Sequence, residues 1–175
     1  MRIVSARVRK TKAIAKDILF RYRDSGPRPL ILALSGNLGS GKTVFAQGIA
    51  QALGVRGKVQ SPTFVLMKWY ELSKPFGGRR FLVHIDAYRI ERPRDLARLG
   101  IREMFRDPDA VIVIEWAEKI RSLIPKTAIW ITFRHSTKTK RIIMVQDRCL
   151  PANYEFQRIT NMRRRIRNAN TIRNS

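Results

Sequence analysis

The stretch Gly36-Asn37-Leu38-Gly39-Ser40-Gly41-Lys42-Thr43 decides how the rest of the sequence is interpreted. It matches the phosphate-binding loop pattern, in which a glycine and four free positions precede Gly-Lys-Thr. Glycines let consecutive backbone N–H groups turn toward one point and leave room for a phosphate chain. Lys42 can then reach the outer phosphates of a nucleotide, and the Thr43 hydroxyl can bind the magnesium that bridges them. The motif therefore predicts a site for a nucleoside triphosphate with Mg²⁺.

The residues on both sides of this loop have the pattern that the motif requires. Residues 29–35 are a short apolar run that begins at a proline, which is typical of a buried parallel strand. After the loop, apolar residues recur at helical spacing, and a glycine follows where a helix would end: Val44, Phe45, Ile49, Ala50, Leu53 and Gly54. A strand, a glycine loop and a helix in this order direct the positive end of the helix at a bound phosphate.

Composition limits the class of protein. The chain has 175 residues, enough for one domain with a real core, which we expect over residues 1–150. No apolar run approaches the length that spans a bilayer, and the first residues lack the pattern of a signal peptide. The single cysteine, Cys149, excludes an internal disulfide and suits a reducing cytoplasm. We therefore expect a cytoplasmic protein that makes no contact with a membrane.

The charge of the chain is unusual. The sequence has 36 Lys and Arg against 13 Asp and Glu, a net charge of +23. Such a charge favours polyanionic partners, either nucleic acid or an acidic protein surface. A general basic bias without any partner behind it stays open as the alternative, because the excess is spread along the chain. Residues 151–175 are polar and arginine-rich, and we expect them to form a frayed or disordered tail that is separate from the domain.

The remainder of the chain alternates between strand and helix patterns. Thr11 is the expected N-cap of a first helix, whereas residues 1–10 fit either an edge strand or an irregular arm. Apolar runs and turn residues predict strands over 65–70, 81–85 and 110–114, a loop over 73–80, short helices over 93–99 and 117–124, and an antiparallel strand pair over 127–133 and 141–145. This alternation predicts an α/β fold.

Two acidic residues stand where predicted strands end. Asp86 follows the strand at 81–85, and Glu115 follows the strand at 110–114. The carboxyl ends of parallel strands face the crevice that also contains the phosphate loop, so both carboxylates can point at a bound metal. A helix N-cap or an ordinary surface acid is the alternative for each of them. Beside a phosphate loop, the pair predicts magnesium-dependent phosphoryl chemistry.

Several nearby residues have less specific interpretations. Arg89 is a candidate for stabilising charge near the outer phosphate, although a surface role is the simpler explanation in so basic a chain. We expect His84 to pack or to form a hydrogen bond, and Trp116 to cover the site or to join the core. Strand packing is the expected role of Phe64, Met67 and Trp69. The sequence has no Asn-Lys-x-Asp motif for guanine, which favours ATP over GTP.

Four motifs in order resemble the bacterial TsaE (YjeE) family of tRNA threonylcarbamoyladenosine biosynthesis ATPases. These are GNLGSGKT, SPTF at residues 61–64, HIDAYR at 84–89 with a later Leu-Gly, and EW at 115–116, and the resemblance covers about residues 11–146. It implies a P-loop NTPase three-layer sandwich, with a mostly parallel central sheet and antiparallel edge strands. It also implies an ATPase, weak alone, that acts with the TsaB and TsaD proteins. Those partners transfer the threonylcarbamoyl group to a tRNA adenosine, and ATP hydrolysis by TsaE supports their repeated turnover.

The resemblance also implies roles for particular residues. Residues 36–43 would bind the phosphates of ATP, with Lys42 among the catalytic groups, and Thr43 with Glu115 would bind Mg²⁺. Asp86 would position water or metal during hydrolysis, and Thr11 would lie near the nucleotide. The SPTF segment resembles a switch that senses the nucleotide state. Asn37 stands where the family often has an acid, and residues beyond about 150 lie outside the resemblance.

Two other classes of function stay open at this stage. The same loop serves small-molecule kinases, although the chain has no separate acceptor-binding insert. The net charge and the basic tail also fit an RNA-binding module for which ATP is a ligand and not a fuel. In the TsaE interpretation, tRNA is reached through the partner complex, with direct contact by a basic surface as a further option.

Overall fold

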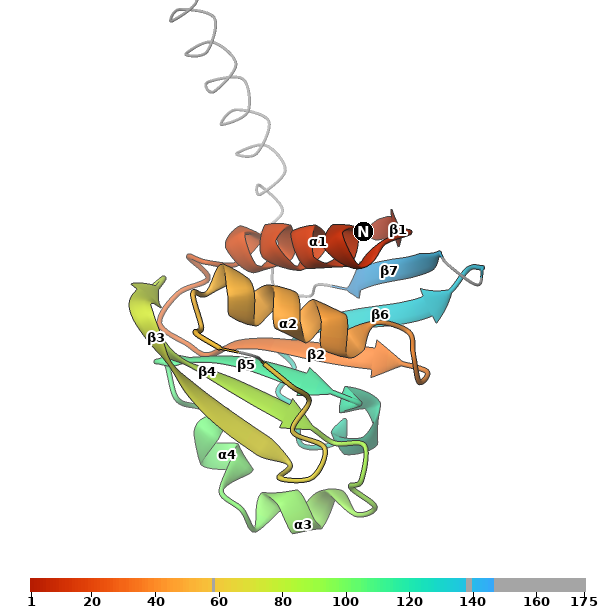
Figure 1. Cartoon of the computed structure of the whole chain (residues 1–175). Coiled ribbons are helices and arrows are strands. Elements are labelled where there is room, and N and C mark those ends of the chain that lie inside the picture. The colour runs from red at the N-terminus through yellow and green to blue at the C-terminus, as the bar shows by residue number, and fades with distance from the viewer. Residues whose placement is uncertain (58, 138–139, 147–175) are drawn as a thin grey trace, which may run out of the picture.

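The computed structural model describes residues 1–57, 59–137 and 140–146. The predicted basic tail, residues 151–175, lies outside the described residues. The described chain forms a single seven-stranded sheet, with the strand order β1-β7-β6-β2-β5-β4-β3 (Figure 1). The strands are β1 (Arg2–Ser5), β2 (Leu30–Gly36), β3 (Met67–Phe76), β4 (Arg79–Asp86), β5 (Ala110–Glu115), β6 (Ile129–His135) and β7 (Arg141–Gln146).

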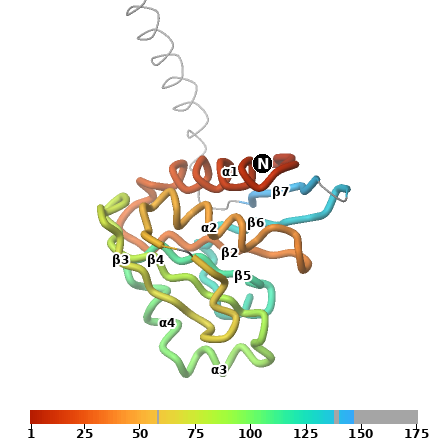
Figure 2. Tube along the Cα trace, viewed as in Figure 1, coloured from red at the N-terminus to blue at the C-terminus, as the bar shows by residue number. Residues whose placement is uncertain are grey.

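The four central strands β6, β2, β5 and β4 are parallel, whereas the flanking pairs β6–β7, β7–β1 and β4–β3 are antiparallel. The expected α/β fold with a parallel centre and antiparallel edges is therefore confirmed. The N-terminal strand β1 pairs with β7, so the two ends of the described chain lie side by side (Figure 2). Of the two options for the first ten residues, the edge strand is correct for Arg2–Ser5, whereas residues 8–10 belong to the first helix.

Helices cover both faces of the sheet. Helices α1 (Val8–Arg21) and α2 (Lys42–Ala52) lie on one face, and α3 (Pro93–Ala97) and α4 (Ile101–Met104) lie on the other (Figure 1). Gly48 lets α1 and α2 approach closely, because a Cβ atom at this position would lie 2.8 Å from the Lys12 Cα and 2.9 Å from the Ala15 Cβ. None of the helices that the structure describes has the length and apolar character needed to cross a membrane.

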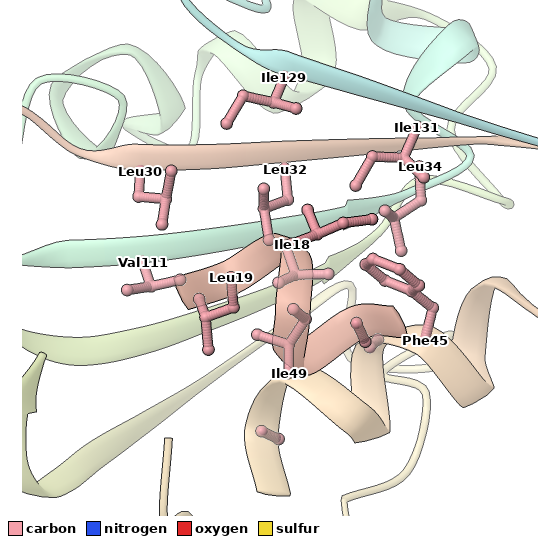
Figure 3. Packing of buried hydrophobic residues seen from close by; sticks show 14 of the residues in the cluster. Ile18, Leu19, Leu30, Leu32, Leu34, Phe45, Ile49, Val111, Ile129 and Ile131 are labelled. Atoms are coloured by element: carbon pink, nitrogen blue, oxygen red, sulfur yellow. The ribbon is translucent and has the colours of Figure 1, made fainter. Parts of the chain in front are cut away.

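The alternation of side chains along β2 builds both halves of the core. Leu30, Leu32 and Leu34 face the α1–α2 layer, whereas Ile31 and Ala33 face the opposite layer. All five are buried, and full burial of a large aliphatic side chain contributes about 1.5–3 kcal/mol. Figure 3 shows the leucines beside the helical side chains that they contact, among them Ile18, Leu19, Phe45 and Ile49. Strand β2, which leads into the phosphate loop, is thus held from both sides.

Three local expectations are wrong. Helix α1 begins at Val8 with Arg7 as its N-cap, so Thr11 lies inside the helix and is buried there. The predicted loop over 73–80 is mostly strand, because the tight turn is confined to Gly77 and Gly78, both with positive φ. The predicted helix over 117–124 is only a short 3-10 helix, η1 (Ala117–Ile120). The strand that leads into the phosphate loop, β2, and its neighbours β5 and β6 were predicted correctly.

Candidate nucleotide-binding site

The phosphate loop (residues 36–43) connects the end of β2 to the start of α2. Gly36, Gly39 and Gly41 have φ angles of +136°, +71° and +103°, which L-residues with side chains rarely adopt. A Cβ atom at Gly36 would also lie 2.3 Å from the carbonyl oxygen of Phe133 on β6. Gly36 is therefore required both by the turn and by the neighbouring strand, whereas Gly39 and Gly41 are required by the turn. The predicted order of strand, loop and helix is confirmed.

A cavity of about 210 Å³ lies against this loop. It is lined by residues 38–44 together with Val8 and Thr11 of α1, Glu115, Trp116 and Arg141. Thr11 therefore reaches the cavity even though it is not a helix cap, and its hydroxyl shares a 2.8 Å hydrogen bond with that of Ser5. The structure thus brings Thr11, Glu115 and most of the phosphate loop to one cavity.

Lys42 folds back onto its own loop. Its Nζ donates to the Gly36 carbonyl at 2.6 Å and to the Asn37 carbonyl at 3.0 Å, and lies 3.6 Å from the centre of the Trp116 ring. Desolvation by burial lowers the pKa of Lys42, and the carboxylates of Glu118, Glu115 and Asp86 oppose this shift. Asn37 therefore interacts with Lys42 through its backbone carbonyl and not through its side chain. Trp116, for which the sequence left two roles open, contacts the lysine at the edge of the cavity.

Glu115 joins the phosphate loop to two central strands. Its Oε2 accepts a 2.7 Å hydrogen bond from Thr43 Oγ1, and its Oε1 lies 2.9 Å from His84 Nε2. Both His84 and Glu115 are buried, and because a carboxylate oxygen only accepts hydrogen bonds, His84 Nε2–H is the donor. The expectation that His84 forms a hydrogen bond is correct. Thr43 and Glu115 present a hydroxyl and a carboxylate oxygen at the same point.

Asp86 is the neighbour of Glu115 across the sheet, because the two residues are register partners at the ends of β4 and β5. Its Oδ2 accepts hydrogen bonds from the hydroxyls of Ser61 and Thr63, the latter at 2.6 Å. Its Oδ1 accepts from the Tyr88 backbone N–H at 2.9 Å. The SPTF segment therefore touches the second acid directly. Spacing along the chain gives no indication of these two hydroxyl contacts.

The structure adds one residue that the sequence did not indicate. Glu118, on η1, accepts a 3.3 Å hydrogen bond through Oε1 from the Gly36 N–H. Trp116, just before η1, has a φ of +57°, and its ring centre lies 5.0 Å from that of Tyr88. This turn brings a carboxylate to the first amide of the phosphate loop. In the sequence, the only indication of this contact is that an acid stands two residues after the Glu-Trp motif.

Arg89, Phe64 and Trp69 do not line the cavity beside the phosphate loop. The Arg89 guanidinium lies 4.4 Å from the centre of the Phe64 ring, and Arg89 is not among the residues that line the cavity. Phe64 is 84% exposed and Trp69 is 51% exposed. The expected strand packing is therefore wrong for Phe64, which lies in the turn before β3. It is correct for Trp69, whose ring packs edge-on against Phe81 of β4 with ring centres 6.2 Å apart, and for Met67, which packs against the core.

The sequence was compared with known protein families and with individual proteins. The model of the family described as "Threonylcarbamoyl adenosine biosynthesis protein TsaE" matches residues 5–143. The tRNA threonylcarbamoyladenosine biosynthesis protein TsaE of Haemophilus influenzae is 30% identical over 126 residues, 72% of this chain and 76% of that protein. The TsaE protein of Bacillus subtilis is 35% identical over 134 residues, 77% of each chain.

The fold was compared with solved structures. The crystal structure of Bacillus subtilis YdiB superposes with a TM-score of 0.66 at 26% sequence identity, covering 94% of this chain and 95% of that one. The aligned segment of the family contains the phosphate loop and both strand-end acids, Asp86 and Glu115. This chain therefore belongs to the TsaE family of tRNA threonylcarbamoyladenosine biosynthesis proteins.

Proposed function

We propose that this chain binds ATP with Mg²⁺ and hydrolyses it as a subunit that acts with the TsaB and TsaD proteins in threonylcarbamoylation of tRNA. Family membership supports the pathway, and the phosphate loop supports the ligand. Residues 38–43 line the cavity, and α2 begins at Lys42, so its positive end would face the phosphates. The site would receive a triphosphate between the loop, α1 and the turn at Trp116.

The observation that carries this proposal is the 2.7 Å contact between Thr43 Oγ1 and Glu115 Oε2. Magnesium in nucleotide sites binds one or two protein oxygens and completes its shell with phosphate oxygens and water. The Thr43 hydroxyl at the start of α2 and the Glu115 carboxylate at the end of β5 fit that donor set. When bound, the metal would neutralise charge that develops on the phosphates. His84 would keep the Glu115 carboxylate oriented through its 2.9 Å hydrogen bond.

Asp86 is suited to orient the attacking water. It lies next to Glu115 in the sheet, and its carboxylate is fixed by Ser61, Thr63 and the Tyr88 amide. A fixed carboxylate can accept a hydrogen bond from water in line with the outer phosphate. Lys42 would exchange its two loop carbonyls for phosphate oxygens, since an ammonium group binds a phosphate more strongly than a neutral carbonyl.

The test combines nucleotide binding with hydrolysis in the purified chain, alone and with the TsaB–TsaD pair. We expect slow magnesium-dependent release of phosphate that rises when the pair is added. Lys42→Ala should remove nucleotide binding. Asp86→Ala should retain binding and lose hydrolysis, and Glu115→Ala should retain metal-free nucleotide binding and lose hydrolysis. Glu91→Ala, which removes an exposed carboxylate away from the cavity, is the matched control.

Three outcomes would contradict the proposal. Hydrolysis at the parent rate in either acid variant would remove that residue from the mechanism. A phosphorylated metabolite in place of free phosphate would indicate a kinase. Normal threonylcarbamoylation of tRNA in cells that lack the chain would separate it from the pathway. Each outcome concerns a different part of the proposal, so the parts can fail independently.

A further inference from the structure

The two helical layers differ in net charge, because the acidic residues are distributed unequally between them. Asp17 and Asp24 are the only acidic residues before Glu71, so the α1–α2 layer is almost free of carboxylates. In the opposite layer, arginines alternate with acidic residues around α3 and α4: Glu91, Asp95, Glu103 and Asp107. The layers lie on opposite faces of the sheet (Figure 1). A polyanion would therefore be attracted to the α1–α2 layer more strongly than to the other.

Helix α1 arranges part of this charge in a row. Arg9, Lys12 and Lys16 follow one another at intervals of three and four residues, so they share one side of the helix. At a rise of 1.5 Å per residue, the row is about 10 Å long. Arg9 and Lys16 are exposed and Lys12 is half-buried, and no carboxylate in the described part of the chain forms an ion pair with any of them. We name these three residues the α1 basic row.

The α1 basic row borders a groove between the two helices. A Cβ atom at Gly48 on α2 would lie 2.8 Å from the Lys12 Cα, so Lys12 stands at the seam where the helices meet. Beside this seam is an open hollow of about 470 Å³, lined by Lys12, Gln47, Gln51, Val55, Gly57 and Val59. Among the residues that the structure describes, its lining has one cation, two amides and no acid. Gln47 uses its Nε2 to donate to the Val59 carbonyl at 3.0 Å, which fixes the wall of the hollow.

We propose that the α1 basic row and this groove bind the phosphate backbone of RNA directly. A line of cations that form no ion pair with a described carboxylate, beside a groove whose described lining has no acid, fits an extended polyanion better than a single small anion. RNA is the polyanion chosen because the chain belongs to a tRNA-modification family. The surface is separate from the proposed nucleotide site, whose cavity receives Val8 and Thr11 from α1 but none of the row. The proposal goes beyond the ATPase activity, since a chain that cannot hydrolyse ATP would still present this surface.

The test measures binding of a fluorescent, unmodified tRNA transcript to the full chain from 50 to 200 mM salt. The variant Arg9→Gln, Lys12→Gln, Lys16→Gln removes the row, and glutamine is a good helix former at exposed positions. The matched control Arg94→Gln, Arg98→Gln, Arg102→Gln removes the same charge from exposed arginines of the opposite layer. We expect the row variant to bind about tenfold more weakly and its salt slope to decrease by about 2 to 3. The control should change affinity by less than about twofold.

Several results would overturn this proposal. Equal losses in the row variant and in the control would show a diffuse charge effect without a defined surface. Absence of tRNA binding by the parent chain at 50 mM salt would contradict direct contact with RNA altogether. Equally strong binding of the parent chain to polyglutamate would indicate an acidic protein as the partner. ATP binding, measured in parallel, should be unchanged in the row variant, which separates this proposal from failure of the nucleotide site.

A second set of variants covers the case in which the triple substitution disturbs folding. Lys12→Gln and Lys16→Gln alone should each lower the salt slope by about 1, while circular dichroism remains that of the parent chain. An unchanged slope in both folded single variants would contradict the proposal. Because every variant retains residues 151–175, the charge of that segment is the same in all comparisons.

Discussion

Thr43 on α2 and Glu115 at the end of β5 are 72 residues apart in the sequence and are joined by a hydrogen bond of 2.7 Å. The contact brings the last residue of the phosphate loop to an acid on the neighbouring parallel strand. The other oxygen of Glu115 is 2.9 Å from His84 Nε2. A carboxylate with a fixed orientation is thus ready beside the loop, and this arrangement leads to the first prediction.

Glu115→Gln keeps the shape of the side chain but removes its charge. We expect the magnesium-dependent part of ATP affinity to fall by about tenfold to a hundredfold, because a neutral amide is a weak ligand for Mg²⁺. Binding of ATP without the metal should change little. Calorimetry with and without Mg²⁺ measures both quantities, with Glu91→Gln as the control for loss of an exposed carboxylate. The same magnesium dependence in the variant and the parent would show that Glu115 is not a ligand.

Glu118→Gln should act in the opposite direction. Glu118 accepts a hydrogen bond from the Gly36 N–H, and its negative charge lies near the place that we assign to the phosphates. Removing this charge reduces repulsion between anions, and we expect ATP to bind about threefold to tenfold more tightly. Glu103→Gln, at an exposed position of α4, should leave the dissociation constant unchanged. Weaker binding in the Glu118 variant would mean that this carboxylate supports the loop.

The two hydroxyls of the SPTF segment should affect turnover and spare binding. Ser61→Ala with Thr63→Val removes both donors to Asp86 Oδ2 and leaves the Tyr88 amide bonded to Oδ1. A carboxylate that is free to rotate orients water poorly, so we expect kcat to fall by about tenfold at an unchanged ATP dissociation constant. Ser73→Ala, at an exposed position of β3, is the matched control. Parent-like turnover would separate these hydroxyls from the action of Asp86.

Stability of the nucleotide-free chain should depend on the ionisation of Lys42. Burial lowers the pKa of this lysine in the folded chain below its ordinary value of 10.5. Between the lowered pKa and 10.5 the unfolded chain binds more protons than the folded one, so this contribution to the free energy of unfolding rises with pH. Below the lowered pKa both states are protonated, and the full cost of burying the charge remains.

Urea unfolding at several pH values checks this dependence. Lys42→Met has no titrating group at the position, so the difference in stability between parent and variant isolates the lysine. We expect this difference to move in favour of the parent as the pH rises toward 10.5. Bound ATP should reverse the trend, because phosphate oxygens favour the charged ammonium. A constant difference across the range would contradict an altered pKa.

The sequence predicted the parts of the site that depend on local order. The phosphate loop is one contiguous motif, and Asp86 and Glu115 follow apolar runs that could only be buried strands. Parallel pairing then brings the two acids into register, as the rule for strand ends implies. The start of α1 was predicted at the wrong residue, because its cap, Arg7, makes no side-chain hydrogen bond and gives no pattern to recognise.

Contacts between distant segments could not be predicted in this way. The approach of Glu118 to the Gly36 amide depends on the left-handed turn at Trp116, a conformation that no tryptophan indicates by itself. The hydrogen bonds from Ser61 and Thr63 to Asp86 depend on how the segment before β3 folds over the strand ends. These contacts follow from tertiary packing, and only the three-dimensional structure reveals them.

Gly36 belongs to two structural units at once. It is the last residue of β2 that pairs with β6, opposite Phe133, and it is also the first glycine of the phosphate loop. Any ligand that fixes the loop therefore also fixes the centre of the sheet, and its binding free energy adds to the free energy of unfolding. A rise in melting temperature with ATP concentration would therefore report the occupancy of the proposed nucleotide site without any measurement of catalysis.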